Sequence, residues 1–225
     1  MKRLLAAAIA AALLLSGCTS ASRPAESAPP TGTPSPSPTP VVTPTPEPEP
    51  ADGELVLVRD YIPGIFIDLK YATTDNFTGR VIYDSDEAYL RYGTVKKLLC
   101  AQNELSGRGL SLKIWDAYRP VSAQFKLWEI CPNPVYVSDP NNGYSKHSRA
   151  NTVDITLVTD TGKSIPMPSG FDDFTSLADR DYSDVSAEAA ENARLLENVM
   201  VENGFVPYSG EWWHYSDSVA YDVYG

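Results

Sequence analysis

The sequence predicts an α+β fold, in which helices pack on a small, mainly antiparallel sheet. Short runs rich in valine, isoleucine and aromatic residues are bounded by glycine, proline and asparagine, which is typical of short strands. Two longer segments instead repeat their apolar residues at helical spacing. Strands and helices follow one another irregularly, and strands adjacent in the sequence are expected to pair antiparallel. Together these three observations favour α+β.

The first expected elements are two strands and a helix. LVLVRD (residues 55–60) and IFIDLKYA (residues 65–72) have strand composition, and a Pro-Gly pair separates them. Residues 86–105 are expected to form a helix, because apolar side chains recur there at helical spacing and two glycines follow.

The middle of the chain predicts strand, helix and strand. LSLKIWDAY (residues 110–118) is an expected strand, and Arg119 continues it because the proline that follows favours an extended backbone. Residues 122–130 predict a short helix that a proline stops. In NTVDITLVTD (residues 151–160) apolar residues alternate with polar ones, so Asp154 should point away from the apolar face.

The last elements are a helix and a strand with a turn in it. Residues 186–203 have a helical apolar stripe, and Gly204 stands at the position after the C-cap, where glycine is favoured. FVPYSGEWWHYS (residues 205–216) predicts a final strand with a turn at Ser209 and Gly210.

The N-terminus predicts export and a lipid anchor. Residues 1–17 combine a basic start with an apolar run of about a dozen residues, which is too short to span a bilayer. The small residues before Cys18 form the sequence LSGC, which resembles the lipobox of bacterial lipoproteins. Ordinary secretion with cleavage nearby is the alternative. We expect the protein to be exported and anchored in the cell membrane through a lipid on Cys18.

Residues 18–52 are expected to be a disordered tether that precedes a single domain of residues 53–225. The tether is rich in proline, serine and threonine and has almost no large apolar side chains. Extended at about 3.1 Å per residue, it would reach up to roughly 90 Å from the membrane. A docking site for a proline-binding module is the less favoured alternative.

Charge and cysteine content restrict the partners. The chain has a formal net charge of −11, which becomes two units more negative when the leader with Lys2 and Arg3 is removed. Such an acidic domain disfavours nucleic acid and electrostatic adhesion to anionic lipid, so membrane attachment should depend on the lipid alone. Cys100 and Cys131 are either a disulfide or two buried thiols, with a slight preference for the disulfide.

The only two histidines of the chain lie among polar residues near carboxylates. Asp154 follows His147 by seven residues, and His214 follows Glu211 by three. Two imidazoles and a carboxylate suit zinc and leave a fourth position for water, with Glu211 as the natural general base. Each spacing alone is weak evidence, since most histidines are surface or packed residues, but together the two patterns use every histidine in the chain.

Four blocks resemble the D-alanyl-D-alanine dipeptidases of the VanX type, a branch of the zinc peptidases that also contains D,D-carboxypeptidases. The similarity covers nearly all of residues 53–225 and implies the zinc D,D-peptidase fold. The four blocks, in chain order, are IDLKYATTDNFTG, WDAYRP, SKHSRANTVDITL and GEWWHYS.

The resemblance implies a role for each motif residue. His147, Asp154 and His214 would bind one zinc ion per chain, and Glu211 would be the general base. Arg119 would bind the substrate carbonyl oxygen and stabilise the oxyanion, as a fixed guanidinium does best where negative charge develops.

Four further motif residues have weaker assignments. Ser145 and Asp116 are candidates to support the ligands, and Trp212 and Trp213 are expected to pack around the site.

Two positions depart from the family pattern S-x-H-x-x-G-x-A-x-D. Ala150 stands at the glycine and Thr152 at the alanine. If position 150 needs a positive φ, alanine costs about 1 kcal/mol there.

The expected function is zinc-dependent hydrolysis of D-alanyl-D-alanine, or a related D,D-dipeptide, at the cell envelope. Asp68 and Asp75 are candidates for pairing with the substrate ammonium. Two alternatives stay open: a D,D-carboxypeptidase or other peptidase acting on peptidoglycan stem peptides, and a wall-binding lipoprotein of weak activity. The intact Glu211 and Arg119 argue against a pure binder.

Overall fold

The computed structural model describes residues 48–225, so the expected leader, Cys18 and nearly all of the tether lie outside the described part. Within it, a five-stranded sheet has the order β2-β4-β5-β7-β6, and β1 pairs with β3 in a small second sheet. Only the β2–β4 pair is parallel. The strands are β1 (Leu55–Leu57), β2 (Phe66–Ile67), β3 (Tyr89–Arg91), β4 (Leu110–Asp116), β5 (Thr152–Thr159), β6 (Phe205–Tyr208) and β7 (Glu211–Asp217).

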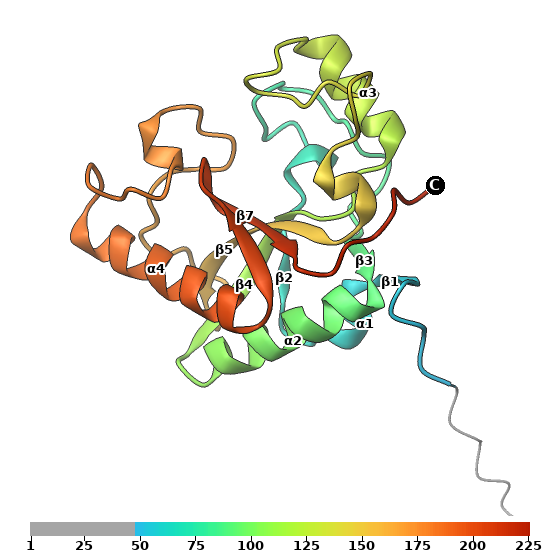
Figure 1. The fold of residues 1–225 in the computed structure, drawn as a ribbon. Helices are drawn as coiled ribbons and strands as arrows, with labels where there is room; N and C mark the ends of the chain where they lie inside the picture. The colour runs from blue at the N-terminus through green and yellow to red at the C-terminus, as the bar shows by residue number, and fades with distance from the viewer. Residues whose placement is uncertain (1–47) are drawn as a thin grey trace, which may run out of the picture. The chain divides into compact units, whose positions relative to one another are not determined.

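Four α-helices and three short 3₁₀-helices accompany the strands in the described residues. The two long helices, α2 and α4, pack against each other and against the five-stranded sheet, whereas α3 lies apart from them (Figure 1). The mixed, mainly antiparallel architecture confirms the predicted α+β class. The helices are α1 (Val58–Tyr61), α2 (Tyr92–Ser106), α3 (Val121–Ile130), α4 (Ala187–Glu202), η1 (Lys70–Ala72), η2 (Lys146–Arg149) and η3 (Ser176–Ala178).

The first three predicted elements were longer than the real ones. The helix expected from residue 86 begins at Tyr92, because the residues before it form β3 and pair with β1. The first early strand ends after three residues, where α1 begins, and the second ends after two residues, shortly before η1. Runs this short have no resolvable periodicity, so buried side chains fit a strand or a helical turn equally well.

The later elements lie close to their predicted positions. In α4, the Ser186 side chain accepts a hydrogen bond from the Ala189 N–H at 3.2 Å, which caps the first turn. Gly204 has φ +85°, a conformation that costs glycine nothing, and it ends the helix as expected. The turn expected at Ser209 and Gly210 separates β6 from β7, so the final segment is an antiparallel hairpin.

The central strand β5 is buried on both of its faces. Val153, Ile155 and Leu157 contribute to the core, as their alternation predicts. Asp154 and Thr156 point the other way but are also buried, at 3% and 5% exposure. A carboxylate is therefore held in the interior of the domain, which is costly unless charged or polar partners surround it.

Cys100 and Cys131, the two cysteines of the described residues, are free, so the slight preference for a disulfide was wrong. Cys100 is exposed on α2 and Cys131 is half-buried directly after α3. These two helices lie well apart in the domain (Figure 1). Between residues 48 and 225, no helix combines the length and the apolar character that crossing a membrane requires.

Candidate active site

The sheet register brings three site residues into one row. Asp116 on β4 is the cross-strand partner of Asp154 on β5, which in turn is the partner of His214 on β7. Directly opposed residues on neighbouring strands have side chains on the same face, with Cβ atoms about 5 Å apart. The row therefore places two carboxylates and an imidazole side by side, although they are far apart in sequence.

His147 reaches this row from the 3₁₀-helix η2. The Ser145 hydroxyl accepts a hydrogen bond from the His147 N–H at 3.3 Å and caps the helix. The imidazole Nδ1 lies 2.8 Å from the Ala117 carbonyl oxygen, and a proton there leaves Nε2 to face Asp154. Ala150 ends η2 with φ +58° and ψ +27°, so this position does adopt the left-handed conformation.

The three expected ligands converge on one point. Asp154 lies between the imidazoles, with Oδ1 2.9 Å from His214 Nδ1 and Oδ2 3.2 Å from His147 Nε2. One ligand atom from each residue can be chosen so that all three lie within 4.8 Å of one another. Two imidazole nitrogens and a carboxylate oxygen at this spacing form a set that can hold a divalent metal ion, and zinc favours that combination.

Burial and charge shape the proton affinity of these ligands. Burial lowers the pKa of His214, which keeps that imidazole neutral and able to act as a ligand. Burial also disfavours the charged forms of His147 and Asp154. Each of these two residues stabilises the charged form of the other and so opposes the effect of burial. The Asp154 carboxylate raises the pKa of His147, and the His147 imidazole helps to hold the pKa of Asp154 well below its usual range.

Glu211 begins β7 and lies at the side of the ligand set. Its Oε2 is 3.5 Å from His214 Nδ1, and its side chain lines the same cavity as the ligands. Burial, together with the nearby Asp154 charge, raises the pKa of Glu211 to about 7. A carboxylate with a pKa close to neutrality is suited to accept and return a proton.

Asp116 fixes Arg119 against the ligands. The guanidinium Nε and Nη2 both donate to Asp116 Oδ2, and Nη1 donates to the Gln124 side chain at 3.0 Å. Burial disfavours the Arg119 charge, yet the Asp116 carboxylate outweighs it and raises the pKa of Arg119 further. Three of the five guanidinium N–H groups are engaged, so two remain for a substrate oxygen.

The expected supports have identifiable contacts. Asp116 is fully buried and accepts hydrogen bonds from the Tyr83 hydroxyl and the Ala117 N–H, in addition to Arg119. Trp212 and Trp213 are buried at 0% and 1% exposure, and their rings pack against Trp115, Phe171 and each other.

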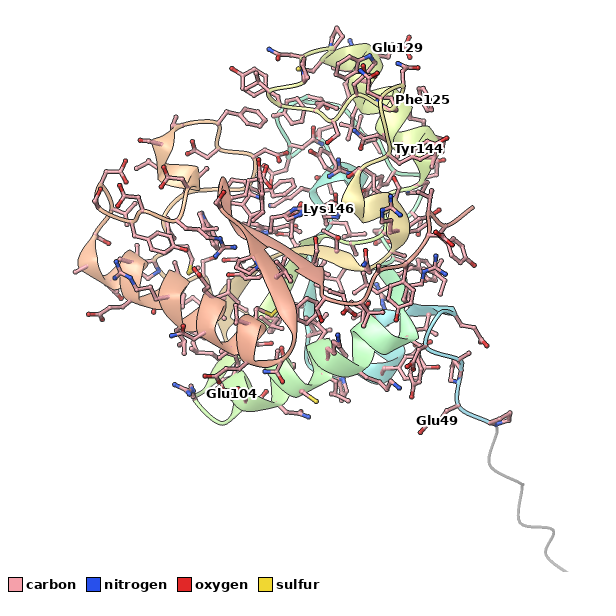
Figure 2. The ribbon with its side chains drawn as sticks, viewed as in Figure 1. Glu49, Glu104, Phe125, Glu129, Tyr144 and Lys146 are labelled. Carbon is pink, nitrogen blue, oxygen red and sulfur yellow. The ribbon has the colours of Figure 1, made fainter. Side chains whose placement is uncertain are left out.

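The ligands, Glu211 and Arg119 open onto one cavity of about 310 Å³, which is at the small end of the range for ligand sites. Lys146, labelled in Figure 2, is exposed and lies on its wall. The remaining wall residues come from η1, from the segment between α3 and η2, from the segment between β5 and η3, and from β6. They are Tyr71, Pro134, Val135, Tyr136, Ser138, Ser145, Asp172 and Tyr208.

Asp172 is a cavity carboxylate that the sequence did not predict. It has φ +53°, accepts a hydrogen bond from the Tyr71 hydroxyl at 2.8 Å, and burial raises its pKa to about 7. Asp68 and Asp75, the acids that were expected at the cavity, pair with Lys70 instead and do not line it. Asp172 belongs to no motif with a fixed spacing, and only its position in a loop between β5 and η3 brings it to the site.

The comparisons with known proteins show the family of this chain. The family model described as Peptidase M15, D-ala-D-ala dipeptidase, matches residues 51–222. A D-alanyl-D-alanine dipeptidase of Escherichia coli (strain K12) is 39% identical over 162 residues, which covers 72% of this chain and 83% of that protein. Enzymes of the same name from Enterococcus faecium and Streptomyces coelicolor are 35% and 36% identical, covering 69% and 73% of this chain and 87% and 91% of their own lengths.

Proposed function

The chain belongs to the Peptidase M15 family of D-ala-D-ala dipeptidases and is a metallopeptidase, and from this premise we propose that it hydrolyses D-alanyl-D-alanine or a close D,D-dipeptide with zinc. One observation carries the proposal. The ligand atoms of His147, Asp154 and His214 converge in a cavity that also holds Glu211 and Arg119. A site that only bound a wall fragment would need neither the base nor the fixed guanidinium.

His147, Asp154 and His214 would hold the metal. When bound, zinc supplies Lewis acidity and makes a water nucleophilic near neutral pH. The hydrogen bond of His147 to the Ala117 carbonyl supports this, because it fixes the tautomer that turns Nε2 to the site. The expected content is one zinc ion per chain.

Glu211 and Arg119 divide the remaining chemistry. Glu211 takes the proton from the attacking water and returns it to the amine of the leaving D-alanine, which a pKa near 7 permits. Arg119 directs its two remaining N–H groups at the carbonyl oxygen, where negative charge develops as the tetrahedral intermediate forms. Asp116 holds the guanidinium in place through two hydrogen bonds, so this donor is oriented before the substrate arrives.

Asp172 provides the charge that a free dipeptide needs. A dipeptide carries an ammonium group next to the scissile bond, whereas a longer peptide has a neutral amide there. A carboxylate whose pKa is raised by burial gains most from a cation placed beside it, because the cation favours the ionised form. We therefore assign Asp172 to the substrate ammonium, in place of Asp68 and Asp75.

The metal assignment is tested by analysing purified protein for zinc after dialysis. The wild type is expected to retain one zinc ion per chain, and His214→Ala is expected to lose it. Stoichiometric zinc in the variant would contradict the ligand set.

The reaction is tested on three substrates, namely free D-alanyl-D-alanine, its N-acetyl derivative and a stem pentapeptide ending in the same pair. The free dipeptide is expected to have a kcat/KM at least about a hundredfold above the pentapeptide, because the longer peptide leaves Asp172 unpaired. Acetylation should remove most of the activity. Comparable kcat/KM values on all three would favour the D,D-carboxypeptidase alternative and leave the zinc chemistry intact.

The expected leader and lipobox support a setting at the cell envelope. Export and a lipid on Cys18 would place the domain at the outer face of the cell membrane, where wall-derived D,D-peptides arise. Turnover of the wall is then the favoured role.

A further inference from the structure

Three aromatic rings from three different loops lie beside the cavity, and the ring of Phe174 contacts the other two. Phe174 lies between β5 and η3, and it packs against Tyr136, from the loop after α3, with ring centroids 4.5 Å apart and planes tilted by 41°. Phe174 also contacts Phe77, from the loop after η1, with ring centroids 5.3 Å apart and the rings nearly perpendicular. We name Phe77, Phe174 and Tyr136 the ring bridge.

Two members of the ring bridge are exposed, whereas Phe77 is half-buried against the core. Phe174 and Tyr136 keep 45% and 46% of their surface in solvent. Burial alone therefore does not explain their positions. Aromatic pairs at such distances attract one another beyond the effect of the area they bury, which makes the bridge a link between loops that share no strand pairing.

The loop that carries Phe174 is held on both sides of Asp172. Phe171 points inwards and packs on Tyr71 and Trp115, at centroid distances of 5.6 and 5.7 Å. Phe174 points outwards to the ring bridge. Asp172 lies between these two anchors with a positive φ, so the loop is fixed at both ends of the turn that presents the carboxylate to the cavity.

The ring bridge lies at the Asp172 end of the cavity. Tyr136 itself lines the cavity, together with Asp172 and Tyr71. Tyr71 donates a hydrogen bond to Asp172 and also packs edge-on against Phe77, with centroids 6.4 Å apart. An amino group bound at Asp172 therefore has the ring bridge next to it.

We propose that the ring bridge limits the length of the substrate on its amino side. This inference rests on the proposed dipeptidase function and deepens it. A residue added before the amino group would extend towards the rings, and it would enter only if Phe174 parted from Tyr136 or Phe77. Parting one such aromatic pair costs about 2- to 10-fold in an equilibrium constant, and parting both costs about the product of the two.

This steric effect adds to the electrostatic effect of Asp172 and can be separated from it. N-acetylation removes the charge but adds few atoms, whereas an added residue with a free amino terminus keeps a charge and adds bulk. The bridge should therefore discriminate against the added residue even when an ammonium group is present.

The test compares kcat/KM for D-alanyl-D-alanine and for a tripeptide with one residue added before it. We expect Phe174→Ala to lower the ratio of dipeptide to tripeptide kcat/KM by about tenfold or more, because both ring contacts of Phe174 are lost. Tyr136→Ala, which removes one contact, should lower it by a smaller factor. This second variant keeps the test valid if Phe174→Ala does not fold.

Phe125→Ala is the matched control. Phe125 lies on α3 with 44% exposure, outside the cavity, and its substitution should leave the ratio unchanged (Figure 2). A wild-type ratio in both Phe174→Ala and Tyr136→Ala, or the same change in Phe125→Ala, would overturn the ring bridge alone. Failure of the wild type to cleave the dipeptide would overturn the proposed function, and this inference with it.

Discussion

Glu211 and the metal ligands lie within a few ångströms of one another but are expected to respond differently to mutation. Glu211 contacts the reacting water in the proposed mechanism, whereas His147, Asp154 and His214 hold the metal. A substitution of Glu211 should therefore affect the chemical step and spare metal content, which separates a base from a ligand.

We expect Glu211→Ala to keep its zinc and to lower kcat by about 10²- to 10⁴-fold, because a general base contributes that much to the rate. Steady-state kinetics on the dipeptide and metal analysis of the same preparation measure both effects. Glu202→Ala, at the exposed end of α4, is the control and should behave as the wild type. A near-normal kcat in Glu211→Ala would exclude the general-base role.

The ionised carboxylate of Asp172, which the proposed function requires, is expected to destabilise the folded protein. Burial raises its pKa to about 7 in the folded protein, while an aspartate in the unfolded chain titrates near 4. The folded state thus binds the proton more tightly, and ionisation of Asp172 destabilises it progressively from about pH 4 to pH 7 and fully above that.

Asp172→Asn is accordingly expected to raise the free energy of unfolding more at pH 8 than at pH 5, by about 1–3 kcal/mol because the side chain is only partly buried. Urea unfolding at the two pH values measures this difference. The same variant should raise KM for the free dipeptide. An equal gain at both pH values would mean that the charge of Asp172 carries no cost in the fold.

The sequence could predict the ligands, Glu211 and Arg119, because their motifs have fixed residue types at fixed spacings. It could not predict Asp172, since a loop of 16 residues between β5 and η3 brings that side chain to the site and no spacing rule constrains such a loop. The same holds for the ring bridge, whose three members come from three loops. The catalytic residues can therefore be predicted from motifs, whereas the cavity residues that select the substrate can be identified only once the fold is known.

At the scale of elements, the end of η2 has a strained residue. Ala150 adopts φ +58° and is fully buried, where the family pattern has a glycine. The left-handed conformation costs a residue with a Cβ about 1 kcal/mol or more, while the buried methyl group returns about 0.8 kcal/mol of hydrophobic stabilisation.

We expect Ala150→Gly to leave the free energy of unfolding nearly unchanged, because these two effects nearly cancel. Ala88→Gly deletes an equally buried methyl group at a position outside helices and strands that lacks a positive φ. It should therefore destabilise the protein by about 1 kcal/mol more than Ala150→Gly does. Chemical denaturation of the two variants makes the comparison, and equal destabilisation would show that η2 is not strained at Ala150.

The element boundaries that the sequence could predict were those with physical markers. Ser186 and Gly204 delimit α4 through a side-chain cap and a positive φ, and the predicted helix has the same two boundaries. No comparable marker separates β1 from α1 or β3 from α2, where pairing between distant segments decides the structure. Tertiary contacts therefore overrode local pattern at the start of the domain and not at its end.

At the scale of the whole molecule, attachment to the membrane remains a prediction, because Cys18 lies outside the described residues. The domain is acidic, and anionic lipid would repel it, so a lipid on Cys18 would be the only anchor. Cys18→Ala is expected to release the protein from the membrane or to leave the leader uncleaved. Fractionation of cells that express each form measures this outcome, and processed variant protein in the membrane fraction would contradict the lipobox.

The row Asp116–Asp154–His214 restricts where the sequence can gain or lose residues without loss of the site. Because successive residues of a strand face opposite sides, inserting or deleting one residue within β5 or β7 would turn a ligand away from the cavity and destroy the site at once. The loops that carry Asp172, Phe174 and Tyr136 belong to no strand pairing, so a change of length in them does not turn a ligand of the row to the opposite face. We therefore expect that exchanging these loops between relatives would transfer a preference for peptide length without rebuilding the catalyst.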